Sequence, residues 1–424
     1  MFVGVGRYNV GAVQAGWCGV GKPTPHPGIG ILVPLGLLFA LVCLALSVIA
    51  LTSASVGAGV SQVSIVSPPN GFVIAEGETV VVHAVSSGRG LVRSELLVDG
   101  VVADAVSSPW IALVGDWSVS HSWQAELPGQ HRLSVRVSSV SGGAVESRSV
   151  VVAIPPPGVI AFSSNREANY EIYRMRTDGR QVTAITSGQG QKREPSCWDQ
   201  QQLLFTLVAD DGGSDVWLLD LQTGRESNLT ASLGGDRWPL WAPDEGTIAF
   251  VSDRYGPSQL FLMNPDGSDQ YQLTQEDFVV EQPSWAPDGS ALLFSGHREG
   301  NWDIFTISLD TGSATPLAED PAQDLQPAWS PTGDEIAFTS NRDGNQQIYI
   351  MQADGSGARR ITAFPLGAEQ PRWSPDGQWI VCVAYTGLGE GVNAREVYIV
   401  RRDGSDQMRL TFDAFDDTEP DWCE

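Results

Sequence analysis

The sequence predicts an all-β protein in which a six-bladed β-propeller follows a β-sandwich and one transmembrane helix. Three observations lead to this prediction. A Pro-x-Trp box returns at a fixed interval, 46 glycines and 26 prolines are spread over the 424 residues, and one long apolar run carries no charge. Dense glycine and proline favour many short strands joined by tight turns. The length leaves room for two or three domains.

The apolar run covers residues 28–51 and is predicted to span a membrane. As a helix rising 1.5 Å per residue it would reach across a hydrocarbon core of about 30 Å. The only nearby charges, Arg7 and Lys22, precede it. The positive-inside rule therefore places residues 1–27 in the cytoplasm and the bulk of the chain in the periplasm or outside the cell. A cleaved signal peptide ending near Ser53-Ala54-Ser55 is the alternative.

A spacer and a small β-domain are expected next. Residues 52–61 are rich in Ser, Ala and Gly and indicate a short flexible spacer. Residues 62–154 contain runs such as Thr79–Val85 that alternate apolar and polar side chains, with turns at Asp99-Gly100 and similar pairs. About seven short strands in this length favour a β-sandwich.

The stretch from Ile65-Val66-Ser67-Pro68-Pro69 to Leu96-Leu97-Val98-Asp99-Gly100 resembles the immunoglobulin-like modules of bacterial surface proteins. This resemblance implies a spacer, with an adhesin as the less favoured reading. Residues 155–158, Pro-Pro-Pro-Gly, form a stiff linker that marks the next domain boundary.

Residues 159–424 consist of six copies of one unit. Each copy has an apolar strand, a polar turn, a second strand, an Asp-Gly or Thr-Gly turn, a third strand and then the box, as in Pro283-Ser284-Trp285-Ala286-Pro287-Asp288-Gly289. The spacing of the box prolines is 44 residues four times and then 49, at Pro195, Pro239, Pro283, Pro327, Pro371 and Pro420. Four short strands per repeat of this length predict propeller blades, and the glycine and proline density excludes helical repeats.

The order of the strands also predicts how the ring closes. The first copy starts without a box, whereas Pro420-Asp421-Trp422 near the C-terminus is a box with no strands after it. The last strand should therefore complete the first blade, giving three strands from one end of the domain and one from the other. Such 3+1 closure would leave no free sheet edge.

Two segments carry a further resemblance. Trp373-Ser374-Pro375-Asp376-Gly377, and Ser340-Asn341-Arg342-Asp343-Gly344 before Ile348-Tyr349, resemble the blade repeat of the TolB-type propeller family. The resemblance covers residues 159–424 and implies a propeller that presents a face or a channel mouth to protein partners. An anchor and a sandwich stand in place of that family's N-terminal α/β domain.

Charge and cysteine usage limit the possible functions. Residues 61–424 carry 23 basic and 50 acidic side chains, which disfavours nucleic acid and anionic lipid as partners. The five cysteines lack the short paired spacings of a zinc or redox motif, so no metal or cofactor is implied. Cys197 and Cys423 lie at similar places in the first and last boxes, and a bridge is conceivable if the domain closes. Buried free thiols are the favoured expectation.

The recurring side chains are expected to be structural. The box tryptophans should pack between blades, and the junction where Cys197 replaces tryptophan should be the least regular. Recurring arginines should pair with turn carboxylates; these are Arg166, Arg254, Arg298 and Arg342.

One set of side chains is a candidate partner-binding ring. These acidic residues lie one to three positions before each box proline, where carboxylates could hold a cation or a Lys or Arg of a partner. Solvated loop charges are the alternative interpretation. The six residues are Glu194, Asp236, Glu281, Asp324, Glu369 and Asp417.

No catalytic residues can be assigned from the sequence. It has no Gly-x-Ser-x-Gly elbow, and its five histidines are scattered, with only His297 in the repeats. We therefore expect a monomeric, membrane-anchored protein that binds a protein or polymer of the cell envelope and is not an enzyme. The alternative is an extracytoplasmic enzyme, a peptidase or a polysaccharide-acting protein, with its site at the channel mouth.

Overall fold

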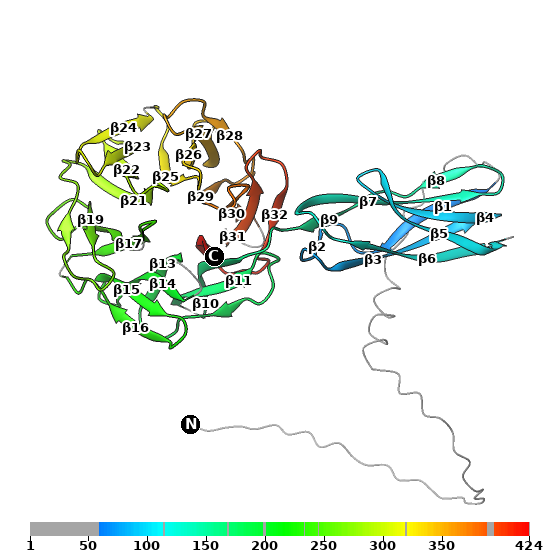
Figure 1. Cartoon of the computed structure of the whole chain (residues 1–424), viewed down its shortest axis with the longest axis horizontal. Helices are drawn as coiled ribbons and strands as arrows, with labels where there is room; N and C mark the ends of the chain where they lie inside the picture. The colour runs from blue at the N-terminus through cyan, green and yellow to red at the C-terminus, as the bar shows by residue number, and fades with distance from the viewer. Residues whose placement is uncertain are drawn as a thin grey trace, which may run out of the picture. The chain divides into compact units, whose positions relative to one another are not determined.

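The computed structural model describes residues 59–112, 115–167, 169–197, 201–232, 234–244, 246–318, 320–387 and 394–423. All regular elements in these ranges are β-strands (Figure 1). The all-β prediction is therefore confirmed. None of the described residues belongs to a helix long and apolar enough to cross a membrane. The predicted transmembrane segment, residues 28–51, lies outside the described residues.

Residues 60–154 form two sheets. The smaller sheet has the order β1 (Val60–Ser67), β3 (Thr79–Gly88) and β6 (Gly115–Gln124). The larger has the order β2 (Phe72–Val73), β9 (Val150–Ile154), β7 (Gly129–Ser139), β4 (Leu91–Val98) and β5 (Val101–Ala112), with β8 (Ala144–Glu146) paired to β7. Side chains from both sheets, including Val82, Leu96 and Val135, share one apolar core.

The described residues from Val159 onward form six four-stranded antiparallel sheets, which Figure 1 shows arranged around a common axis. The sheets are called A to F in chain order of their first strands. Sheet A has the order β12 (Thr183–Ala184), β11 (Asn169–Arg176), β10 (Val159–Glu167) and β33 (Asp417–Cys423); sheet B is β13 (Gln191–Cys197), β14 (Gln202–Val208), β15 (Ser214–Asp220) and β16 (Arg225–Asn228); sheet C is β17 (Asp236–Trp241), β18 (Ile248–Ser252), β19 (Gln259–Met263) and β20 (Tyr271–Gln272).

The remaining three sheets repeat this plan. Sheet D is β21 (Val279–Trp285), β22 (Ala291–Arg298), β23 (Asn301–Ser308) and β24 (Ala314–Ala318); sheet E is β25 (Asp324–Trp329), β26 (Glu335–Ser340), β27 (Gln347–Gln352) and β28 (Arg359–Arg360); sheet F is β29 (Ala368–Trp373), β30 (Trp379–Thr386), β31 (Ala394–Arg401) and β32 (Gln407–Arg409). The innermost strands are β13, β17, β21, β25, β29 and β33.

The C-terminal strand completes the first sheet. β33 pairs antiparallel with β10, with Val159 opposite Cys423 and Ser164 opposite Asp417. This pairing joins the two ends of the repeat region, as the order of the boxes predicts. It also covers the edge of β10, which would otherwise present unpaired backbone groups.

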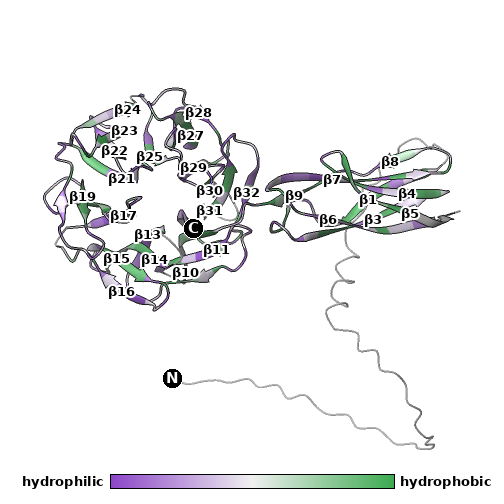
Figure 2. Ribbon diagram, in the orientation of Figure 1, coloured by the Kyte–Doolittle hydropathy of each residue, from purple (hydrophilic) through white to green (hydrophobic). Residues whose placement is uncertain are grey.

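The apolar side chains explain why the sheets pack face to face. Strands such as β18 and β26 are buried at every position and do not alternate, because both faces of a sheet are covered by neighbouring sheets. Six apolar clusters each join two consecutive sheets of the ring. Figure 2 shows hydrophobic residues along the strands and hydrophilic residues in many of the turns. Each sheet thus contributes one face to the apolar core with the preceding sheet and the other face to the core with the following sheet.

The box tryptophans lie at these junctions, as expected. The indole of Trp373 donates to the carbonyl oxygen of Ala328 at 3.0 Å, and that of Trp422 donates to Arg372 at 3.3 Å. In both cases the acceptor is on the innermost strand of the preceding sheet. Trp285 donates to Leu240 in the same way, at 3.4 Å.

One cysteine expectation was wrong. A disulfide joins Cys197 on β13 to Cys423 on β33, across the junction between sheets A and B. The expectation of free thiols underestimated how closely ring closure brings the first and last boxes together. Cys382 is a free, buried thiol among the described residues, and burial raises its pKa to about 12.

Candidate functional site

A backbone irregularity recurs in every innermost strand. Proline has no N–H to donate to the neighbouring strand, and the pairing of each innermost strand shifts register at the box proline. The residue before the proline has a left-handed φ, between 51° and 61°, in all six strands. These residues are Glu194, Trp238, Gln282, Gln326, Gln370 and Glu419. Left-handed backbone at six non-glycine residues costs free energy. This cost indicates that the fold requires the side chains of these residues to point in one particular direction.

The irregularity places these six residues on the wall of an axial cavity. All six innermost strands contribute to the cavity, which the six residues line together with four of the box prolines, Arg372 and Asp421. We call this set the channel ring; it consists of Glu194, Trp238, Gln282, Gln326, Gln370 and Glu419. The channel ring is the site around which the sheets are arranged.

Hydrogen bonds link the channel ring from sheet to sheet. Glu194 Oε2 accepts from the amide of Trp238 at 2.7 Å. Gln326 Oε1 accepts from the amide of Gln370 at 2.9 Å, and Gln370 Oε1 accepts from the amide of Glu419 at 2.8 Å. Glu419 Oε2 accepts from the amide of Glu194 at 2.9 Å and so continues the chain of bonds across the closing junction. These side chains therefore satisfy backbone donors that the register shift leaves unpaired.

The candidate partner-binding ring occupies three different register positions. Asp236, Asp324 and Asp417, three residues before the proline, are completely buried. Each receives hydrogen bonds from an arginine at or just after the end of the neighbouring strand: Arg254 to Asp236 at 3.0 Å, Arg342 to Asp324 at 2.8 Å, and Arg166 to Asp417 at 2.8 Å. Three of the four recurring arginines thus pair with the very carboxylates proposed for a partner, and these three aspartates do not line the cavity.

The other three candidates lie elsewhere. Glu281 and Glu369 are two residues before the proline; Glu369 accepts from the Tyr385 hydroxyl at 2.9 Å and lies 3.5 Å from Arg395. Burial raises the pKa of Glu281, an effect that Arg237 and His297 oppose. Of the six candidates, Glu194 alone contributes to the axial cavity.

The cavity holds carboxyl groups with unusual pKa values. Burial, reinforced by the charge of Glu419, raises the pKa of Glu194 to about 7. Burial likewise raises the pKa of Asp421 to about 6, although Arg372 opposes the shift. Glu419 has Arg193 as its partner, with Nε 3.1 Å from the carboxylate. Arg372 bonds to the carbonyl oxygen of Pro371 at 3.1 Å, so further guanidinium donors are available.

A second cavity lies along the same axis. It shares Ser196, Leu240, Arg372 and Asp421 with the first, and continues among the box tryptophans and the prolines at 287, 331 and 375. The residue after the box proline varies among the sheets and only serine occurs twice: Ser196, Leu240, Ser284, Ala328, Arg372 and Asp421. Packing that repeats in every sheet does not explain a residue that varies from sheet to sheet. We call these six residues the variable neck, and binding specificity would depend on them.

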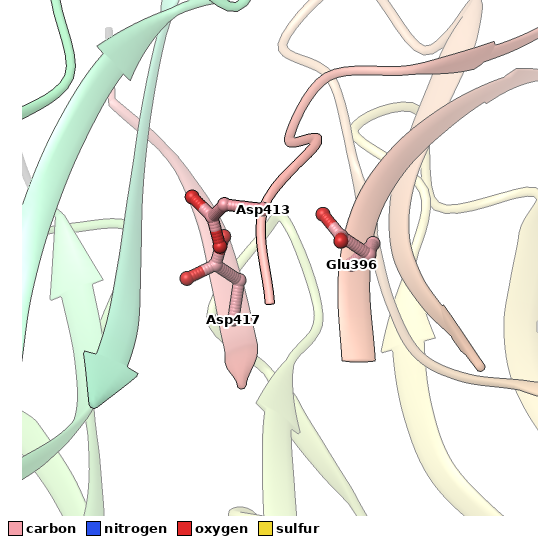
Figure 3. Close-up of side chains that lie close together, drawn as sticks. All are labelled: Glu396, Asp413 and Asp417. Atoms are coloured by element: carbon pink, nitrogen blue, oxygen red, sulfur yellow. The ribbon is translucent and has the colours of Figure 1, made fainter. Parts of the chain in front are cut away.

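Another group of carboxylates converges between sheets F and A. Glu396, Asp413 and Asp417 offer oxygen atoms within 4.8 Å of one another (Figure 3). Two arginines already balance these charges: Arg409 lies 2.6 Å from Glu396, and Arg166 lies 2.8 Å from Asp417 and 3.2 Å from Asp413. The cluster is therefore explained as a buried ion-pair network that joins two sheets.

The sandwich contains a Ser-His-Asp arrangement that sequence reasoning missed. His121 Nε2 lies 2.8 Å from Ser94 Oγ, and His121 Nδ1 lies 3.1 Å from Asp104 Oδ2. These distances match a hydrolase triad. Ser94 and His121 are however completely buried, between β4 of one sheet and β6 of the other. A nucleophile needs access to substrate, so the arrangement serves to connect the two sheets.

Comparisons with known proteins agree with this fold. Residues 272–422 match the family profile of the TolB beta propeller domain. The structure of TolB from Acinetobacter baumannii superposes with a TM-score of 0.55 at 20% identity, covering 70% of this chain and 80% of that one. The fold and axial cavity define a β-propeller. More particularly, this chain carries a TolB-like β-propeller domain.

Sequence relatives match over shorter ranges. A protein TolB homolog of Chlorobium luteolum is 31% identical over 119 residues, 28% of this chain and 27% of that protein. An uncharacterized peptidase, YuxL of Bacillus subtilis, is 32% identical over 74 residues, 17% of this chain and 11% of that protein. The chain thus matches about a quarter or less of the length of these relatives.

Proposed function

We propose that this protein is a membrane-anchored, extracytoplasmic binding protein whose six-bladed, TolB-like propeller presents its axial channel to a protein or polymer of the cell envelope. The observation that carries this proposal is the variable neck of the channel. Arg372 and Asp421 lie there on neighbouring innermost strands, and both line the two axial cavities. A small number of well-placed polar groups in a partly apolar cavity is typical of a binding site.

The rest of the chain supports this placement. Residues 28–51 would anchor the protein with residues 1–27 in the cytoplasm, and the sandwich, with its immunoglobulin-like strand content, would hold the propeller away from the lipid. The Cys197–Cys423 disulfide favours an oxidising compartment. The acidic charge makes nucleic acid an unsuitable partner. We further propose that the protein acts as a monomer.

Affinity capture with the full-length protein tests the proposal. Wild type, Arg372→Gln and Arg225→Gln would each be incubated with solubilised cell envelope. Arg225 is exposed on the outer strand β16 and is the matched control. We expect Arg372→Gln to reduce capture of a defined partner by about tenfold, because a partly buried arginine in a cavity is a typical binding hot spot. Equal capture by all three proteins would contradict the proposal.

An enzyme of the channel is the second candidate, and one observation favours it. Glu194 and Asp421 line the same cavity with pKa values raised to about 7 and about 6. Carboxyl groups with such values suit proton transfer near neutral pH. Peptide and polysaccharide panels would be incubated with wild type, Glu194→Gln and Asp421→Asn. Turnover that both substitutions abolish, without a stable partner, would favour the enzyme; turnover equal in all three would exclude the channel as its site.

A further inference from the structure

The closing junction of the propeller differs from its neighbours. At other junctions a box tryptophan packs between innermost strands, and the indoles of Trp285, Trp373 and Trp422 donate to the preceding strand. Cys197 occupies the tryptophan position at the junction between β33 and β13. Its sulfur is bonded to Cys423, 226 residues away in the sequence. At this junction a disulfide bond therefore replaces the tryptophan packing found at the other junctions.

The strand that this disulfide holds is also part of the channel wall. β33 supplies Glu419, Pro420 and Asp421 to the axial cavity. It is the C-terminal strand of the described chain, and its only strand partner there is β10. Three further contacts cross the junction: Arg193 to Glu419, the Glu194 amide to Glu419 Oε2 at 2.9 Å, and the Cys197 amide to Asp421 Oδ2 at 2.9 Å. Displacement of β33 would remove part of the channel ring and of the neck.

We propose that the Cys197–Cys423 disulfide is a redox-controlled latch: its reduction releases β33 from β13 and opens the channel wall at this junction. The inference goes beyond the proposed function, because it concerns the wall itself and requires no ligand. The closed channel would then be a property of the oxidised protein.

The pair is placed where a reductant can reach it. Both cysteines are only partly buried, and Cys197 borders the second axial cavity. Cys382 is completely buried between sheets E and F, and its raised pKa leaves it unreactive. The exchange would therefore be confined to the junction.

The chemistry is ordinary thiol–disulfide exchange with a dithiol. A dithiol thiolate attacks one cysteine sulfur, the S–S bond breaks, and the other cysteine leaves as a thiolate that takes up a proton. The second thiol of the reagent then attacks the mixed disulfide. The protein gains two thiols, and the dithiol becomes a cyclic disulfide.

Hydrogen exchange measured by mass spectrometry tests the latch. Full-length protein would be compared before and after dithiothreitol treatment, with iodoacetamide added to confirm modification of Cys197 and Cys423. We expect amides of residues 417–423 to exchange about tenfold faster or more after reduction, while those of β25, two sheets away around the ring, change less than twofold. Cys197→Ser/Cys423→Ser should show the fast pattern without reductant, and Cys382→Ser should behave like wild type.

Three results would overturn the latch. One is unchanged protection of residues 417–423 in protein shown to be fully alkylated at both cysteines. Another is equal acceleration in β33 and β25, which would indicate general destabilisation. The third is a pair that the dithiol cannot reduce in the folded protein. None of these depends on finding a partner, so they are separate from a failure of the proposed function.

Discussion

At the level of single residues, the position before each box proline matters most. It carries Glu or Gln in five of the six innermost strands and Trp238 in the sixth. In four of these five strands the amide or carboxylate oxygen accepts the backbone N–H of the next strand, which explains why these two residue types recur. The charged members, Glu194 and Glu419, flank the closing junction. Glutamine accepts this backbone N–H as well as glutamate does, so the structural role does not require the negative charge of Glu194 and Glu419.

The raised pKa of Glu194 predicts that the stability of the folded protein depends on pH. In the unfolded chain the carboxyl has an ordinary pKa near 4.5, whereas in the fold the value is about 7. The folded protein therefore retains the proton more strongly, and stability falls as pH rises from about 4.5 to 7. Glu194→Gln should remove this effect and raise the free energy of unfolding by about 2–3 kcal/mol at pH 8, with little change at pH 4.5.

The reciprocal variant serves as the control. Gln326 has the same position in sheet E and the same kind of bond to the next strand. Gln326→Glu should introduce the pH dependence that Glu194→Gln removes. Urea unfolding at pH 4.5, 6 and 8 measures both. Parallel curves for wild type and Glu194→Gln over this range would contradict the assigned pKa.

Two members of the candidate partner-binding ring should respond differently to neutralisation. Asp324 is completely buried beside Arg342. Burial raises the pKa of this carboxyl too, but Asp324→Asn leaves the arginine cation without its carboxylate and should cost about 3 kcal/mol. Glu281 has a pKa raised by burial, so Glu281→Gln should be neutral or slightly stabilising at pH 7. Thermal unfolding compares the two. Equal losses would show that both carboxylates play the same role.

At the level of elements, the turn before the third strand of each repeat takes two forms. Glycine has positive φ in all six turns, as predicted. A Cβ on Gly355, in an Asp-Gly turn, would lie 2.1 Å from the carbonyl oxygen of Leu317 in the preceding sheet. A Cβ on Gly312, in a Thr-Gly turn, would meet nothing within 4 Å. The Asp-Gly turn therefore packs against its neighbour, whereas the Thr-Gly turn is free.

This difference predicts unequal effects of alanine. Gly312→Ala should cost about 1 kcal/mol, the penalty for a side chain at positive φ. Gly355→Ala adds a clash with backbone, which cannot rotate away, and should cost about 3 kcal/mol or more. Urea unfolding at constant pH measures both changes. The reverse order would mean that the two turns are not distinguished by their contact with the preceding sheet.

The sequence was sufficient to predict the strands, the turns and the pairing of the last strand with the first. These follow from local chemistry: apolar runs, glycine at positive φ and a box without following strands. The register shift at each box proline was not predicted, since it results from pairing between strands. As a result the acidic residues were treated as one ring, although a one-residue change of register turns a side chain to the opposite face.

At the level of the whole molecule, ring closure creates features that no segment contains. The disulfide, the Glu194–Glu419 pair and the axial cavity each combine residues from opposite ends of the repeat region. The sequence places Cys197 and Cys423 at similar positions of the first and last boxes, but free thiols were the favoured expectation because buried free cysteines are common. Arg372 and Asp421 were likewise missed. Their signal was available as the two charged residues directly after a box proline, at a position that varies among repeats.

The central claim is that the channel wall is the binding surface. Photocrosslinking in the envelope tests it most directly, with a photoreactive amino acid placed at Gln282 in the channel ring and, as a control, at Tyr271, which is exposed on the outer strand β20. The account predicts a discrete partner adduct from position 282 and none of that mass from position 271. The same adduct from both positions, or from 271 alone, would contradict it.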